Sequence, residues 1–96
     1  MSNYKYAKVH IQTQKLQECL KLITSKLLSL SDDIDGPMLD YPSHIGKYWK
    51  VFINIASKTH KDRHRVAGLV LEALKKYPKI IKSITLDIDP TQREYL

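Results

Sequence analysis

The stretch YWKVFINIA, residues 48–56, decides the fold of this chain, because its apolar and polar side chains alternate with a period of two. Such alternation is typical of a β-strand that turns one face to a hydrophobic core and the other to solvent. The core face would carry Trp49, Val51, Ile53 and Ile55. The solvent face would carry Tyr48, Lys50 and Phe52. The pattern therefore predicts a strand over residues 48–56 with aromatic and basic side chains outside.

The chain before this strand contains a second alternating segment and a helical segment. Residues 4–12 predict a first strand, with Ala7, Val9 and Ile11 facing inward and Tyr6, Lys8 and His10 facing outward. Apolar residues then recur every three or four positions, which predicts a helix that ends near Ser31. Thr13 is the expected N-cap of this helix, and Leu20 is expected in the core.

The segment between this helix and residues 48–56 has a poorer pattern. Gly36-Pro37 is expected to break the helical region. Residues 38–44 predict a short edge strand, because prolines flank it and an edge strand has one unpaired side. Residues 45–47 predict a tight connection into the next strand.

The chain after residues 48–56 repeats the same order of elements. A second helix is predicted to begin within residues 59–62 and to stop before Pro78, since apolar residues return to helical spacing. Residues 80–89 predict the last strand. The order β-α-β-β-α-β predicts an α+β, ferredoxin-like fold: a four-stranded antiparallel sheet, strands one and three central, with two helices on one face. Residues 1–96 are expected to form one domain.

Composition narrows the class of partner. The formal net charge is +6 at pH 7, which favours a polyanion and above all nucleic acid, although many basic domains bind no anion. The single cysteine, Cys19, excludes an internal disulfide and is expected to be buried in a reducing compartment. No apolar run approaches the roughly 20 residues of a membrane span. Residues 1–6 lack the apolar core of a secretion signal, so an intracellular location without a membrane partner is predicted.

Two groups of residues are candidates for binding RNA. The first lies on the solvent face of the two central strands, where aromatic rings can stack on unpaired bases and lysines can neutralise phosphates; it comprises Tyr6, Lys8, Tyr48, Lys50 and Phe52. A neighbouring protein is the alternative occupant of this face. The second group opens the second helix, whose N-terminus already attracts phosphate; it comprises Lys58, His60, Lys61, Arg63, His64 and Arg65. The alternative for this group is a solvated helix start.

Signals for catalysis and for metal binding are weak. No nucleophile has an obvious base, and no glycine-rich phosphate loop or pocket-forming carboxylate pair is present, so no enzyme is predicted. His60 and His64 have a spacing that can serve zinc, but Lys61 follows His60 where a zinc hydrolase has glutamate, and no third ligand is apparent. We predict no metal, no cofactor and no small-molecule substrate.

Three stretches resemble the small-subunit ribosomal protein ten family: the helix before Gly36-Pro37, then Pro42-Ser43, then residues 52–55 followed by Thr59-His60-Lys61. The resemblance implies the same topology, with ribosomal RNA and neighbouring ribosomal proteins as partners in a cytoplasmic or mitochondrial small subunit. The chain departs from the family because only residues 44–47 stand in place of its long hairpin. BolA-type proteins are a rival resemblance, through residues 49–51 and 63–66, but their last-strand histidine has no counterpart here.

These observations predict a non-catalytic, basic, RNA-associated protein, namely a structural component of a ribosomal small subunit. In this role Arg63 and Arg65 would be exposed phosphate contacts, and replacing either with alanine would hardly change folding. The alternative is a protein-binding adaptor or inhibitor module that docks through its open sheet face or an edge strand. Salt would distinguish the two, since phosphate binding weakens steeply as salt rises.

Overall fold

The computed structural model describes residues 4–88, and for Tyr41 it describes the backbone alone. The first strand is followed by a helical region in three parts, a hairpin, a long helix and a final strand. In chain order the elements are β1 (Lys5–Thr13), α1 (Leu16–Leu22), a π turn (Ile23–Leu27), a 3₁₀ turn (Leu28–Leu30), β2 (Ile34–Ile45), β3 (Tyr48–Ser57), α2 (His60–Lys75) and β4 (Ser83–Ile88).

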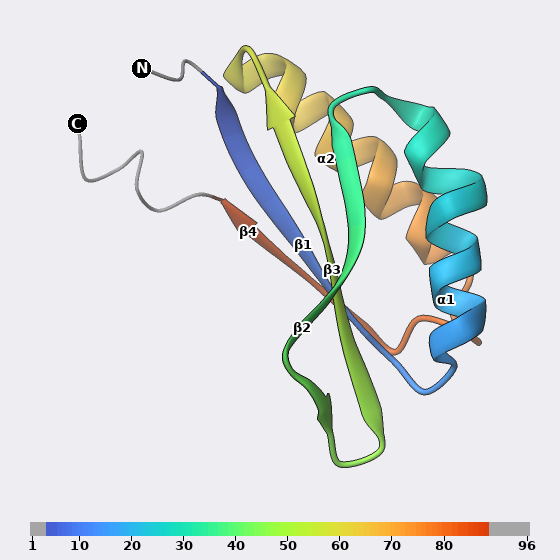
Figure 1. Cartoon of the computed structure of the whole chain (residues 1–96). Coiled ribbons are helices and arrows are strands. Elements are labelled where there is room, and N and C mark those ends of the chain that lie inside the picture. Colours follow the sequence, from blue (N-terminus) through green and yellow to red (C-terminus); the bar gives the residue numbers. More distant parts are fainter. Residues whose placement is uncertain (1–3, 89–96) are drawn as a thin grey trace.

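The strands form one four-stranded sheet in the order β2-β3-β1-β4. Every neighbouring pair is antiparallel, and β1 and β3 pair from Lys5↔Ser57 to Thr13↔Trp49. Both helices cover the same face of the sheet (Figure 1). The ferredoxin-like α+β prediction is confirmed, including the central position of the two strands with the clearest alternation.

The hydrophobic core lies between this face and the helices. Alternate residues of β1 and β3 are buried there, and those between them face the other side, as the period of two predicts. We call the uncovered side the open face. The core residues from the two central strands are Ala7, Val9, Ile11, Val51, Ile53 and Ile55, each at most 3% exposed.

The start of α1 differs from the prediction. Thr13 is the last residue of β1 and is fully buried, and the residue that caps α1 is Lys15, which makes no side-chain capping bond. The Thr13 hydroxyl accepts a hydrogen bond from the Lys15 N–H at 2.9 Å and donates one to the Ile80 carbonyl at 2.6 Å. Thr13 therefore ties the end of β1 to the segment before β4.

The helical region packs on the sheet through part of its apolar stripe. Cys19, Leu22, Ile23 and Leu27 are buried, whereas Leu20 is half-buried and packs against the core. The apolar stripe is wide enough to dock in more than one rotation, and packing on the sheet turns its Cys19 side inward. The prediction that Leu20 lies in the core is therefore correct only in part. The end of the region at the 3₁₀ turn agrees with the expected end near Ser31.

The edge strand β2 is longer than predicted. It begins at Ile34, so Gly36-Pro37 lies inside the strand rather than in a loop before it. The pairing with β3 shifts register between Asp35 and Met38, which lets the chain accommodate the proline. Gly36 has φ +125°, and a Cβ there would lie 3.3 Å from Ile53 Cγ2, so glycine is required. Gly46 and Lys47 form the two-residue connection to β3.

The second half of the chain follows the prediction closely. The Thr59 hydroxyl accepts a hydrogen bond from the Asp62 N–H at 3.1 Å and so caps α2, which ends before Pro78. β4 begins at Ser83 rather than at residue 80, because the Ile80 carbonyl is taken by Thr13 and Ile81 turns into the core. The expected last residue of this strand, at position 89, lies outside the described residues. Within residues 4–88, no helix has the length and apolarity needed to cross a membrane.

Candidate nucleic-acid interface

Basic side chains gather where three segments meet at one end of the sheet. The start of β1, the end of β3 and the start of α2 lie together there (Figure 1). Lys5 pairs with Ser57, and α2 begins three residues after Ser57. We call this group the basic end; it comprises Lys5, Lys58, His60, Lys61 and His64. All but the half-buried Lys5 are exposed.

The electrostatic potential of the basic end is positive. The pKa of His60 is lowered, first by desolvation from the surrounding chain and then by the positive charges of Arg63, Lys5 and His64. Two acids lie near the basic end. The carboxylate of Asp62 lies 3.7 Å from Arg65 Nε, and the carboxylate of Asp33 accepts a hydrogen bond from the Ser57 hydroxyl at 2.7 Å. The charges of Asp62 and Arg65 largely cancel, and the basic end keeps an excess of basic side chains.

Arg63 does not belong to this exposed group, contrary to the prediction. It is only 5% exposed. Arg63 precedes Val66, Ala67 and Val70 at intervals of three, four and seven residues, which places all of them on one face of a helix. Arg63 therefore lies on the stripe of α2 that packs on the sheet. The same spacing is visible in the sequence, but the prediction that Arg63 is exposed relied on the density of charge around it. Arg63 is part of the folded core of α2 and cannot contact a phosphate as an exposed side chain.

The aromatic residues predicted for the open face do lie on it but do not form one platform. Tyr6 and Tyr48 are at opposite ends, since Tyr6 pairs with Ala56 near the end of β3 and Tyr48 begins β3 at the hairpin (Figure 1). Phe52 is half-buried, and the Lys8 ammonium lies 4.4 Å from the centre of its ring. One ring face of Phe52 is thus already covered by the chain itself.

The centre of the open face holds an imidazole between two carboxylates, which the sequence did not reveal. His10 Nδ1 lies 3.1 Å from Asp40 Oδ2, and His10 Nε2 lies 3.9 Å from Asp87 Oδ2. These carboxylates come from the two edge strands, so only the sheet order brings them to β1. A hollow of about 390 Å³ lies beside them and is lined by His10, Ile11, Gln12, Asp40, Lys50, Ser83 and Thr85. Negative charge here opposes a phosphate, so the basic end is the better place for one.

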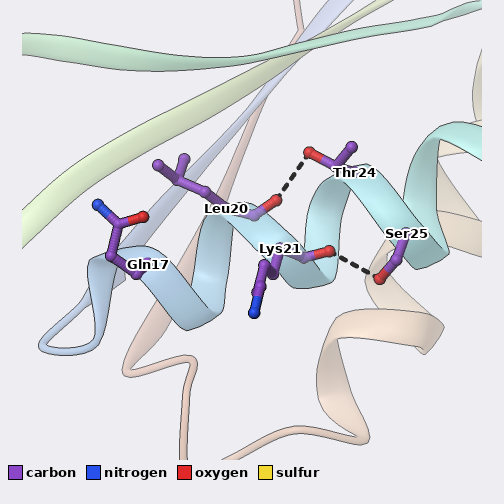
Figure 2. Close-up of a pocket in the computed structure, with 5 residues that line it drawn as sticks. All are labelled: Gln17, Leu20, Lys21, Thr24 and Ser25. Carbon is purple, nitrogen blue, oxygen red and sulfur yellow. Dashed lines mark hydrogen bonds between the residues drawn. The ribbon is translucent and has the colours of Figure 1, made fainter.

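A second hollow, of about 310 Å³, lies on α1 and the π turn (Figure 2). Its lining comes from one helical segment, with Leu20 and Lys21 near the middle. The hydroxyls of Thr24 and Ser25 donate to the carbonyls of Leu20 and Lys21 at 2.9 and 2.7 Å, so both are engaged by the backbone. A hollow whose lining comes from a single helical segment is poorly suited to enclose a substrate.

Within residues 4–88, no three side chains of His, Cys, Asp or Glu are placed to hold a metal ion together. His60 and His64 both lie in the first part of α2, and Asp62, which lies between them in the sequence, does not complete such a group. Cys19 is buried, and burial raises the pKa of its thiol to about 11, so it is a poor ligand or nucleophile at neutral pH.

Comparison with known proteins identifies the fold only. The structure resembles the crystal structure of a NipSnap family protein of unknown function from Agrobacterium tumefaciens strain C58, with a TM-score of 0.59 and 15% sequence identity over 92% of this chain and 88% of that one. No protein-family profile matches the chain, and no curated protein does. The resemblance to the small-subunit ribosomal protein ten family, and the weaker one to BolA-type proteins, are therefore wrong.

Proposed function

We propose that this protein is a non-catalytic RNA-associated protein that holds RNA phosphates at its basic end. The observation that carries the proposal is the convergence of Lys5, Lys58, His60, Lys61 and His64 from the ends of three elements. Three lysines and two imidazoles around one helix N-terminus can contact a run of phosphates, and each phosphate that a lysine neutralises releases counterions. The partner proposed is RNA in general, because the ribosomal assignment rested on a resemblance that is wrong.

The lowered pKa of His60 supports this proposal and supplies a direct assay. Desolvation, and after it the charges of neighbouring cations, hold the pKa of His60 below its usual 6.5 in the free protein. A bound phosphate favours the imidazolium, so the pKa of His60 should rise when RNA binds. By linkage, RNA affinity should increase as the pH falls through the pKa of His60, and His60→Gln should remove part of that increase. Imidazole chemical shifts measured against pH, with and without RNA, report both pKa values.

A salt titration of affinity tests the site itself. The probe is a fluorescein-labelled RNA strand of 15 nucleotides, and anisotropy is read between about 50 and 300 mM salt. Lys58→Gln combined with Lys61→Gln should reduce the slope of log affinity against log salt by about 1.4, at about 0.7 per phosphate contact. Lys21→Gln combined with Lys26→Gln is the matched control, since it removes the same charge from exposed positions on the other helical region.

Equal effects of the two double variants on the salt slope would contradict a localised site. The net charge of the protein would then explain the binding. Absence of RNA binding at 50 mM salt would contradict the function. Binding to a protein that is insensitive to salt would instead favour docking through the open face, where Met38 and Ile45 are 39% and 49% exposed. An intracellular location, cytoplasmic or mitochondrial, follows from an RNA partner and belongs to the same proposal.

A further inference from the structure

Two tyrosines lie on the open face directly beside the basic end. Tyr4 and Tyr6 are 44% and 39% exposed, which is unusual for side chains of this size. Their ring centroids are 6.4 Å apart, and the rings are tilted by 45°. Residues two apart on a strand share a face, so both rings project from the same side of the sheet. Tyr4 lies at the start of the strand that the sequence predicts over residues 4–12, but it was not among the residues predicted to bind RNA.

The sheet register brings these rings to the lysine that follows β3. Tyr6 pairs with Ala56 and Lys5 pairs with Ser57, which is the last pair of the two strands. Tyr4 comes directly before that pair in the chain, and Lys58 comes directly after it. Lys5 points to the helix side of the sheet, where its charge acts on His60. At this end of the sheet, the aromatic rings thus lie on the open face, and cations lie beside them and on the helix side.

We infer that this end of the sheet selects single-stranded RNA, with unpaired bases stacked on Tyr4 and Tyr6 while the adjoining phosphates contact Lys58 and the rest of the basic end. The inference rests on the proposed function and adds the class of nucleic acid. Bases in a duplex are stacked on each other and are closed to a tyrosine, whereas a single strand can splay its bases onto aromatic rings. The rings therefore contribute only with a single strand, and the cations contribute with either form.

The experiment compares three probes of equal length: a single RNA strand, the same strand in a duplex, and a ribose–phosphate strand that lacks bases. The protein variants are Tyr4→Leu with Tyr6→Leu, Tyr4→Phe with Tyr6→Phe, and Tyr48→Leu. Tyr48 is the matched tyrosine, on the same face at the hairpin end. The Phe variant keeps both rings and so controls for folding, which the backbone amide spectrum also checks.

The Leu double variant should bind the single strand about 5- to 100-fold more weakly than the unaltered protein. Its affinities for the duplex and for the baseless strand should stay within about twofold, and its salt slope should not change, because stacking releases no counterions. The Phe variant and Tyr48→Leu should retain binding of the single strand.

Two results would overturn the inference: a Leu double variant that binds the single strand like the unaltered protein, or a duplex and a baseless strand that bind as tightly as the single strand. Failure of this inference can be told apart from failure of the proposed function. If only the inference fails, the lysines of the basic end still govern the salt slope. If the proposed function fails, the affinity for every probe is unaffected by the changes at Lys58 and Lys61.

Discussion

Arg63→Ala is expected to lower the free energy of unfolding by about 2–3 kcal/mol, although Arg63 is a charged residue in the first turn of a surface helix. The side chain is 5% exposed and lies on the buried stripe of α2. Alanine keeps Cβ, so the change removes two methylene groups of the stem, and at about 0.8 kcal/mol each their burial contributes about 1.6 kcal/mol. Packing lost around the space that alanine leaves adds to this figure.

Urea denaturation followed by circular dichroism measures the effect. With a dependence on urea typical of small proteins, the midpoint should fall by roughly 1–2 M while the slope m stays constant. Arg65→Ala is the matched control, because its side chain is 58% exposed and pairs with Asp62 in solvent; it should change stability by less than about 0.5 kcal/mol. Arg63→Met keeps most of the stem and should recover about half of the loss.

The reasoning is refuted if Arg63→Ala and Arg65→Ala have the same stability within about 0.5 kcal/mol. That result would mean that the Arg63 stem gains nothing from its burial. A changed slope m would instead point to an altered unfolded or native ensemble, and stability would then be measured by thermal unfolding. In thermal unfolding, a loss of about 2 kcal/mol corresponds to a midpoint lower by roughly 8–16 °C in a domain of this size.

Three further predictions follow from the core, from the thiol and from the metal question. Leu27→Ala should cost about 2–5 kcal/mol because Leu27 is fully buried, whereas the half-buried Leu20→Ala should cost about half as much or less; equal losses would contradict the observed rotation of the helical region. Cys19 stays protonated in the folded state up to a pKa of about 11 but ionises near 9 when unfolded, so stability should fall as the pH rises from 9 to 11, by at most about 1.4 kcal/mol per pH unit. Cys19→Ala should lack that part of the fall, and a parallel decline in both proteins would argue against it. We expect no stoichiometric zinc by elemental analysis of the purified protein, and zinc that is lost with His64→Ala would show this to be wrong.

Much of the candidate interface could be predicted from local patterns of residues. The error discussed here is the predicted exposure of Arg63, and it has a physical cause. The period of two in residues 48–56 correctly placed Tyr48, Lys50 and Phe52 on the open face. Charge density alone placed Arg63 on the surface, but helix docking buries it with Val66. A charged residue with a long apolar stem can join a buried stripe, so charge does not decide its exposure.

The sequence by itself determined the order of elements, and with it the fold, because alternation and helical spacing are properties of neighbouring residues and only a few small folds accept β-α-β-β-α-β. Only the tertiary structure decided which distant residues meet. The two carboxylates beside His10 come from opposite edges of the sheet, and the register of β1 and β3 brings Tyr6 beside Ala56 and Lys5 beside Ser57. Register and docking are set by long-range packing, in which a shift of one residue exchanges the two faces of a strand, and no local pattern specifies that choice completely.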